Sequence, residues 1–247
     1  KQQFKVKTGY ALGPGNSLDF DLLIPRPGLT REHWKTRKQT MDIKKDWYPL
    51  SFSDNKSVSG DLAFVGYGIS APEMDYDDYE GIDVTDKVVI MIMETPDGDD
   101  PESKFAPYAS NRYKAFNARN KGAVGIIFVK VQGDSMNVFE RLENNLDGNN
   151  SGIVAVQMNR QSLSKFFPKE KRLIATEIKI NETKKAHSFV IADCSVNISV
   201  VLEDKYSETH NIMAMIEGTD PALKDEYVIV GAHYDHLGWG AQNSRYT

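Results

Sequence analysis

The residues with the clearest chemical potential are a histidine and an aspartate two positions apart near the end of the 247-residue chain. His233 and Asp235 follow residues 226–232, an apolar run with the composition of a buried strand. In open α/β sheets, ligands bind at the carboxyl ends of the strands. A histidine there can bind a metal through one ring nitrogen, while a nearby carboxylate fixes the ring through the other. The H-x-D spacing alone is a weak signal: taken by itself it favours a hydrogen-bonded histidine at a strand end, and a metal ligand is the alternative.

The elements around this pair predict a mixed α/β (α+β) protein with short strands and few helices. Four apolar runs bounded by Gly, Pro, Asp or Asn predict strands: residues 62–65, 88–93, 124–129 and 153–157. Helical spacing predicts two helices, the first ending at Gly122 and the second capped by Asn159: residues 111–121 and 160–167. Three further strands are expected nearer the C-terminus: residues 196–200, 211–216 and 226–232.

These elements predict three parts of the chain. Residues 1–50 are rich in Gly and Pro and should form an irregular segment, with short strands at 3–6 and 19–24, that packs on the rest. Residues 51–180 should form a compact domain. A polar linker at 181–187 should then lead to a separate sheet within 188–247, whose first two strands pair as a hairpin.

Composition narrows the classes of protein to which the chain can belong. Apolar residues make up 40% and charged residues 26%, as in ordinary globular proteins. The longest uninterrupted apolar run, residues 88–93, is far shorter than the roughly 20 residues that a membrane span needs. The single cysteine, Cys194, excludes an internal disulfide and a cysteine-based zinc site. We therefore predict no membrane span in this chain.

The charge balance argues against nucleic acid as a partner. The net charge is −5, from 35 acidic and 30 basic residues, which leaves no basic excess for phosphate binding. Six Lys and Arg residues, together with His33, do gather within residues 31–45. Acidic residues lie among them and no clean apolar stripe accompanies them, so we interpret this segment as a solvated surface.

Two sequence patterns carry a resemblance to a known family. The segment N211-I-M-A-M-I-E-G218 and the segment G231-A-H-Y-D235 match an N-[VI]-x-A-x-I-x-G strand followed by a strand ending in G-x-H-x-D. This pair resembles the start of the catalytic domain of zinc-dependent exopeptidases, the family of bacterial leucyl aminopeptidase and glutamate carboxypeptidase. The resemblance implies that His233 binds one of two zinc ions and that Asp235 is a catalytic-site residue that supports it.

A second resemblance lies upstream, in three segments of the middle region: residues 60–72, 76–90 and 114–129. They resemble a protease-associated (PA) domain, which in this exopeptidase family often precedes or interrupts the peptidase domain. The order found here, with the PA-like region before the G-x-H-x-D strand, is the order the family implies. The fold implied is a PA domain with a curved or barrel-like sheet, followed by the first strands of an α/β zinc-exopeptidase sheet.

The resemblance also implies that much of the catalytic site is missing. The family places further acidic ligands, a Glu base and a final His after this strand, but no Asp or Glu follows Asp235. We therefore expect this chain to be a fragment that binds no full complement of zinc and is inactive alone. Its parent would be a dinuclear zinc aminopeptidase, acting on peptide substrates and exported to the periplasm, medium or cell surface. The alternative is a non-catalytic PA-domain binding module on the same scaffold.

Exposed strands at the truncated end predict a further property of the chain. A sheet of the expected kind is covered by helices on both faces, and no such helix follows residues 226–232. Bare strand edges and apolar faces promote association. We therefore expect a homo-oligomer or another strand-mediated association, or packing of these strands on residues 1–50.

Overall fold

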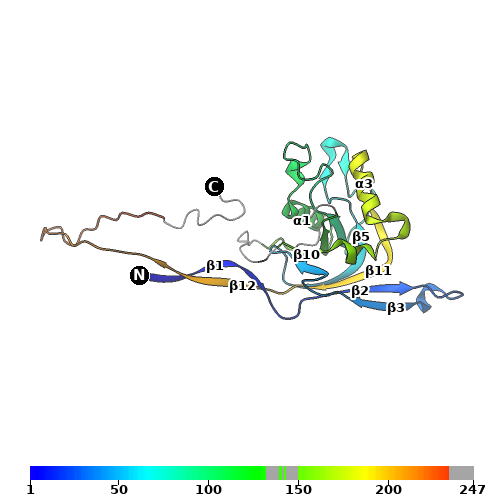
Figure 1. Ribbon diagram of the computed structural model, residues 1–247, viewed down its shortest axis with the longest axis horizontal. Helices are drawn as coiled ribbons and strands as arrows, with labels where there is room; N and C mark the ends of the chain where they lie inside the picture. Colours follow the sequence, from blue (N-terminus) through cyan, green and yellow to red (C-terminus); the bar gives the residue numbers. More distant parts are fainter. Residues whose placement is uncertain (132–138, 141, 143–149, 234–247) are drawn as a thin grey trace. The chain divides into compact units, whose positions relative to one another are not determined.

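The computed structural model describes residues 1–131, 139–140, 142 and 150–233 (Figure 1). The chain divides into two compact units. The larger unit is Lys5–Ser207, and the smaller unit combines Lys1–Phe4 with Glu208–Thr247. Among the described residues, no helix is long and apolar enough to cross a membrane.

An eight-stranded mixed sheet is the centre of the larger unit. Its order is β3 (Lys35–Thr40), β2 (Ser17–Ile24), β11 (Phe189–Ser199), β5 (Ser57–Phe64), β8 (Val88–Ile92), β9 (Gly125–Val129), β10 (Val154–Met158) and β4 (Trp47–Pro49). The four strands from β5 to β10 run parallel to one another. The strands at both ends of the sheet join antiparallel, so the fold is mixed α/β, as the sequence predicts.

The remaining elements are short. Two two-stranded sheets pair β1 (Gln2–Leu12) with β12 (Leu202–Asn211), and β6 (Ser70–Ala71) with β7 (Tyr76–Asp77). The α-helices are α1 (Asn111–Asn120), α2 (Arg160–Ser164) and α3 (Leu173–Thr183). The 3-10 helices are η1 (Arg31–His33), η2 (Pro72–Met74), η3 (Ala106–Tyr108) and η4 (Lys169–Lys171).

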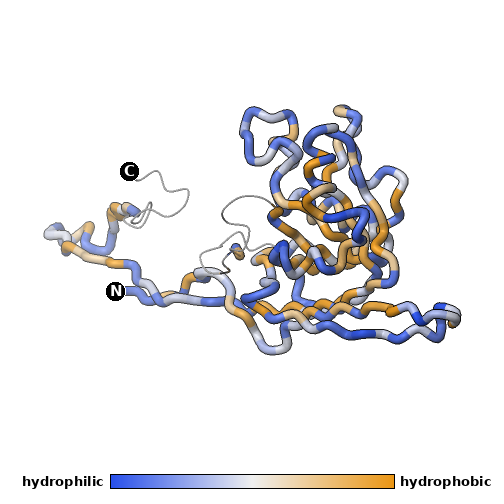
Figure 2. The backbone as a smooth tube through the Cα atoms, turned by 45° about the vertical axis from the view of Figure 1, so that its right-hand side comes forward, coloured by the Kyte–Doolittle hydropathy of each residue, from blue (hydrophilic) through white to orange (hydrophobic). Residues whose placement is uncertain are grey.

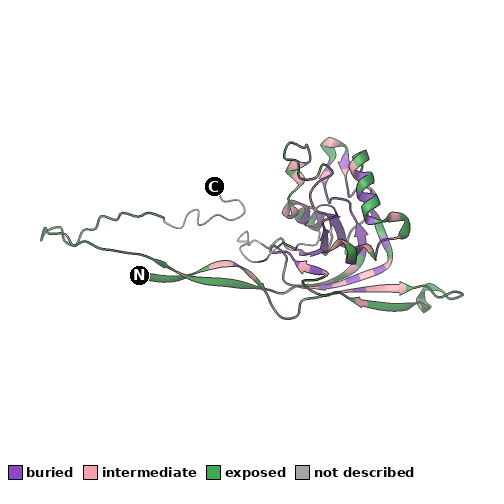
Figure 3. Cartoon of the chain, in the orientation of Figure 1, coloured by how far each residue is buried: buried purple, intermediate pink, exposed green. Residues whose placement is uncertain are grey.

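Two apolar cores lie on opposite faces of this sheet. On β8, Val88 and Ile90 belong to one core, whereas Val89 and Met91 belong to the other. Helices α2 and α3 add residues to the first core, and α1 adds Ala115 and Ala118 to the second. The central strands are therefore apolar on both faces, which is why they read as uninterrupted apolar runs (Figures 2 and 3).

The predicted elements of the middle region are confirmed. The four predicted strands correspond to β5, β8, β9 and β10, and the two predicted helices correspond to α1 and α2. Asn159 caps α2, because its side-chain oxygen accepts a hydrogen bond from the Ser162 amide at 2.8 Å. Gly122 follows α1 with a positive φ of 91°, the conformation that ends many helices.

The predicted organisation after residue 180 differs from the structure. The strand expected to open a separate sheet lies within β11, where Val196 pairs with Phe20 of β2 and Gly60 of β5. The expected hairpin is wrong, because β11 lies between β2 and β5. Residues 203–208, which separate the two expected strands, are part of β12. The expected linker at 181–187 begins inside α3. Val196 and its neighbours alternate between apolar and polar residues. The apolar face packs into the same core as residues of β2 and β5, which are distant in sequence.

A buried carboxylate fixes the turn that follows β5. Asp78 is fully buried, and its Oδ2 accepts hydrogen bonds from the backbone amides of Tyr67 and Ile69, both at 3.0 Å. Its Oδ1 accepts one from the Tyr76 hydroxyl at 3.0 Å. Gly66 lies against this carboxylate with a φ of 48°, so a Cβ added there would collide with Asp78 Oδ1.

We predict that Gly66→Ala destabilises the chain far more than Gly81→Ala. Both glycines have positive φ, but an added Cβ at Gly81 meets nothing within 4 Å. Gly81→Ala should cost about 1 kcal/mol of backbone strain. Gly66→Ala must also displace Asp78, and should cost about 3 kcal/mol or more. Urea denaturation followed by tryptophan fluorescence measures both, and equal losses would contradict the prediction.

A buried lysine holds helix α1 against the end of β8. Lys114 is fully buried, and its Nζ donates hydrogen bonds to Ile92 O at 3.0 Å and to Glu94 O. The ammonium also lies 5.5 Å from the centre of the Tyr67 ring. Burial lowers the pKa of Lys114 to about 7, and burial raises the pKa of Asp78 to about 7. Both side chains are buried and bind backbone groups, so each holds neighbouring segments together.

We predict that Lys114→Met lowers the free energy of unfolding by roughly 3 kcal/mol, because buried carbonyls lose their donor. Between about pH 7.5 and 9.5, wild-type stability should receive a contribution from Lys114 that rises with pH, since only the unfolded chain keeps this lysine protonated. The variant should lack this rise. Lys121→Met, at the exposed end of α1, is the control. The Lys121 Nζ lies 3.8 Å from Asp77 Oδ2, so losing this surface ion pair should lower the free energy of unfolding by less than about 1 kcal/mol. A variant with the wild-type pH slope would refute this role.

Candidate functional site

The structure places one of the two predicted site residues and leaves the other outside its description. His233 lies in the smaller unit, in an exposed segment without helix or strand. Asp235 lies outside the described residues. The expected strand at 226–232 is not formed, and Tyr227, Val228 and Ile229 are 73%, 94% and 90% exposed. Within the described ranges, His233 is therefore not part of a group of side chains that could hold a metal ion.

The residues in the described part of the chain do not fit the two zinc ions that the family resemblance implies. No group of three or more His, Cys, Asp and Glu side chains there is arranged to hold a metal ion. A zinc site needs three or four protein ligands, and His233 supplies at most one. Any zinc chemistry would require ligands in addition to those that the structure describes.

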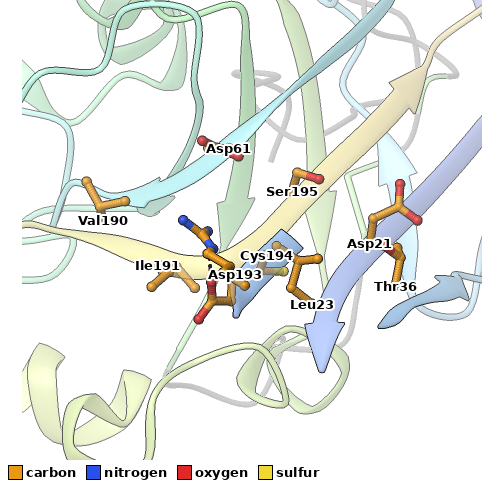
Figure 4. A pocket seen from close by; sticks show the side chains of 11 residues that line it. Asp21, Leu23, Thr36, Asp61, Val190, Ile191, Asp193, Cys194 and Ser195 are labelled. Carbon is orange, nitrogen blue, oxygen red and sulfur yellow. Dashed lines mark ion pairs between the residues drawn. The ribbon is translucent and has the colours of Figure 1, made fainter. Parts of the chain in front are cut away.

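The larger unit contains a pocket at an irregularity in β11. The register of β11 against β5 shifts between Ile191 and Ser195, and Asp193 has a left-handed φ of 58°. This bulge opens a cavity of about 570 Å³. Figure 4 shows its walls, formed by Asp21, Leu23, Arg31, Thr36, Asp61, Val190, Ile191, Ala192, Asp193, Cys194 and Ser195.

The charges of this pocket come from three adjacent strands and the 3-10 helix η1. Asp21 on β2 and Asp61 on β5 are both directly opposite Ser195, so the three share one face of the sheet. Asp193 forms an ion pair with Arg31 of η1 at 2.8 Å. Three carboxylates against one guanidinium make the pocket acidic, which suits polar or cationic groups.

The thiol in this pocket is not suited to nucleophilic chemistry. Cys194 is buried, and burial together with the nearby carboxylates Asp21 and Asp61 raises its pKa to about 12. A thiol with this pKa is protonated at neutral pH, and only the thiolate is a good nucleophile. The pocket therefore has no activated cysteine nucleophile.

Sequence reasoning identified neither the pocket nor its lining. The alternation in β2 does indicate that Asp19 and Asp21 face away from the core residues Leu18 and Phe20. The bulge at Asp193 has no comparable signal, because it arises from the register between strands that are far apart in sequence.

The comparisons with known proteins find distant structural similarity only. An aminopeptidase from Aneurinibacillus sp. strain AM-1 has 18% sequence identity and a TM-score of 0.43. The aligned region covers 85% of this chain and 36% of the aminopeptidase chain. The zinc aminopeptidase BSAP from Bacillus subtilis has 14% identity and a TM-score of 0.41, with coverages of 84% and 34%. A peptidase M28 precursor from Shewanella amazonensis SB2B has 15% identity and a TM-score of 0.34, with coverages of 85% and 40%.

The chain spans about a third of the length of the first two of these aminopeptidases. No protein-family model and no curated protein sequence matches it.

We predict that Cys194 is alkylated slowly in the folded chain. A pKa of about 12 instead of the ordinary 9 lowers the thiolate fraction at pH 8 on the order of a thousandfold, and burial slows access further. Iodoacetamide labelling followed by mass spectrometry reports this residue alone, because the chain has one cysteine. The same chain in urea is the control, and native labelling within about tenfold of the urea rate would contradict the prediction.

Proposed function

We propose that this chain is part of a metal-dependent aminopeptidase, to which it contributes a PA domain and the first segment of the catalytic domain. Residues 51–180 would be the core of the PA domain, with β2, β3 and β11 extending its sheet. The segment 208–238 would belong to the catalytic domain. The proposal is supported by two groups of sequence motifs that occur in the order expected for such an enzyme.

The observation that carries the proposal is the exposed apolar segment that leads to His233. Tyr227, Val228 and Ile229 are exposed together, followed by Val230 at 92%. Full burial of such a side chain stabilises a protein by about 1.5–3 kcal/mol, so four exposed in succession indicate a strand that needs neighbours on both sides. In a complete catalytic sheet, this strand would bury its side chains and deliver His233 to the sheet edge.

The roles that we assign to the site residues follow from their chemistry. His233 would be one metal ligand through a ring nitrogen, and Asp235 would accept a hydrogen bond from the other ring nitrogen. Such a carboxylate fixes the orientation of the ring and makes the imidazole a stronger ligand. The substrates would be peptides, from which N-terminal residues are removed.

A second candidate function is a binding module without catalysis. The larger unit favours it, because this unit has a complete core on both faces of its sheet and an acidic pocket of its own. In such a protein His233 would have no metal to bind. Metal content therefore discriminates between the two candidates.

We predict that the protein encoded by the full reading frame binds two zinc ions and hydrolyses aminoacyl anilides. His233→Ala should lower kcat/KM by more than about a hundredfold, because a lost ligand costs at least as much as a lost ligand-supporting residue. His33→Ala, an exposed histidine on η1, is the matched control and should leave kcat/KM unchanged. The 247-residue chain alone should show neither stoichiometric zinc nor hydrolysis.

The outcomes separate the two candidates. A full-length protein that holds no zinc and hydrolyses no anilide would support the binding module. Full activity in the 247-residue chain would show that the residues present suffice, against our proposal. Zinc content is measured by plasma mass spectrometry on the same samples used for the assay.

A further inference from the structure

The two outermost strands of the large sheet differ in how open they are. β4 is only three residues long and ends at Pro49, which has no backbone N–H to offer a partner strand. β3, at the other end, is six residues long, and five of them are exposed. In the part of the chain that the structure describes, β3 pairs with β2 alone. Its far side is an open edge, where another extended segment could add to the sheet.

The hydrogen-bonding groups on this edge can be identified from the register. The Met41 amide donates to Leu18 O at 2.9 Å, so these two residues form a hydrogen-bonded pair. Such pairs alternate along antiparallel strands, so the backbone groups of Arg37 and Gln39 also point towards β2. Those of residues 36, 38 and 40 then point away from the sheet. Their N–H and C=O groups form a row that a further strand could use.

The side chains on β3 define the charge of a suitable partner. The strand carries Lys35, Arg37 and Lys38 and no acidic residue. Lys38 forms an ion pair with Asp19 of its own sheet at 3.0 Å. Lys35 and Arg37 form no ion pair with any described residue and are exposed. A second copy of β3 would place like charges opposite one another, which is destabilising, whereas acidic side chains would complement them.

The loop that connects β2 to β3 adds an apolar contact next to this edge. Ile24 at the end of β2 and Leu29 in the loop are both exposed. The Trp34 indole donates a hydrogen bond to Leu29 O at 3.3 Å, which holds the loop against the start of β3. Binding surfaces commonly combine a row of polar contacts with a small apolar anchor. β3, with its open edge and basic residues, is the last strand at one end of the sheet, and the loop leads directly into it. Figure 1 shows β3 beside β2.

We propose that β3 is a docking strand for an extended acidic segment of a partner protein, which pairs with its open edge and extends the eight-stranded sheet. Backbone hydrogen bonds to residues 36, 38 and 40 would supply affinity, as in other cases of strand addition. Lys35 and Arg37 would select glutamate and aspartate in the partner. β3 belongs to the larger unit and His233 to the smaller unit, and the inference does not depend on the aminopeptidase assignment.

The proposal predicts selective binding of acidic extended peptides. The probe is a synthetic peptide of alternating Glu and Val, blocked at both ends, and the comparison is the same peptide with Lys in place of Glu. The 247-residue chain should bind the Glu peptide at least ~tenfold more tightly in calorimetry. Amide hydrogen exchange by NMR should show new protection at residues 36, 38 and 40, with Arg37 and Gln39 unchanged.

Three variants separate strand pairing from simple charge attraction. The triple variant K35E/R37E/K38E should reverse the preference in favour of the Lys peptide. K104E/K169E/K185E changes the net charge by the same amount at exposed sites outside β3 and should keep the Glu preference. Lys38→Pro removes one outward N–H from an edge strand, where proline is tolerated, and should weaken binding of the Glu peptide at least ~tenfold.

The same measurements can overturn the proposal. Equal binding of both peptides, or loss of the Glu preference in the control triple variant, would exclude β3 as the selecting surface. Binding without protection of the outward amides would show a charged patch and no strand addition. Tighter binding of a single-stranded oligonucleotide or of anionic phosphatidylserine vesicles, again without that protection, would assign β3 to a different class of partner.

Discussion

The pairing of β11 between β2 and β5 is the constraint on which the rest of the larger unit depends. β11 is antiparallel to both neighbours, and it joins residues near position 20 to the parallel strands that begin with β5. Val196 and Ile198 are fully or almost fully buried beside Leu18 and Phe20, so one apolar row continues across the three strands. Without β11, these residues would lose their common core and β2 and β3 would have no link to the sheet.

The same strand also creates the polar features of the larger unit. Its inner residues complete the core, while its outer residues Ser195 and Asn197 lie among the carboxylates of β2 and β5. The bulge at Asp193 interrupts this regular pattern and opens the acidic pocket. In contrast, His233 lies in a segment that no such pairing positions. A metal centre requires side chains from distant parts of the sequence to converge. β11 brings such distant residues together in the larger unit, by pairing with both β2 and β5.

The sequence predicted those elements whose signal is local. The strands β8, β9 and β10 are buried on both faces and are readable as apolar runs, and Asn159 and Gly122 mark helix ends directly. The position of β11 was not predictable in this way, because alternation indicates a half-buried strand but not its neighbours. Helix α3 was missed since its β-branched residues weaken the helical signal and Ile174 and Ile178 remain exposed. Of the candidate site, the sequence identified His233 and Asp235 but not the pocket.

The long separation between β2 and β11 also governs the order in which the chain can acquire its structure during synthesis. The hydrogen bond from Asn197 to Asp21 closes a loop of 176 residues. At about 5–20 residues per second, β2 leaves the ribosome roughly 10 to 35 seconds before its partner exists. During this interval the apolar face of β2 has no core to join, so the nascent chain is exposed to misfolding. The sheet must therefore be completed late, and a chaperone that shields the first strands would act in this interval.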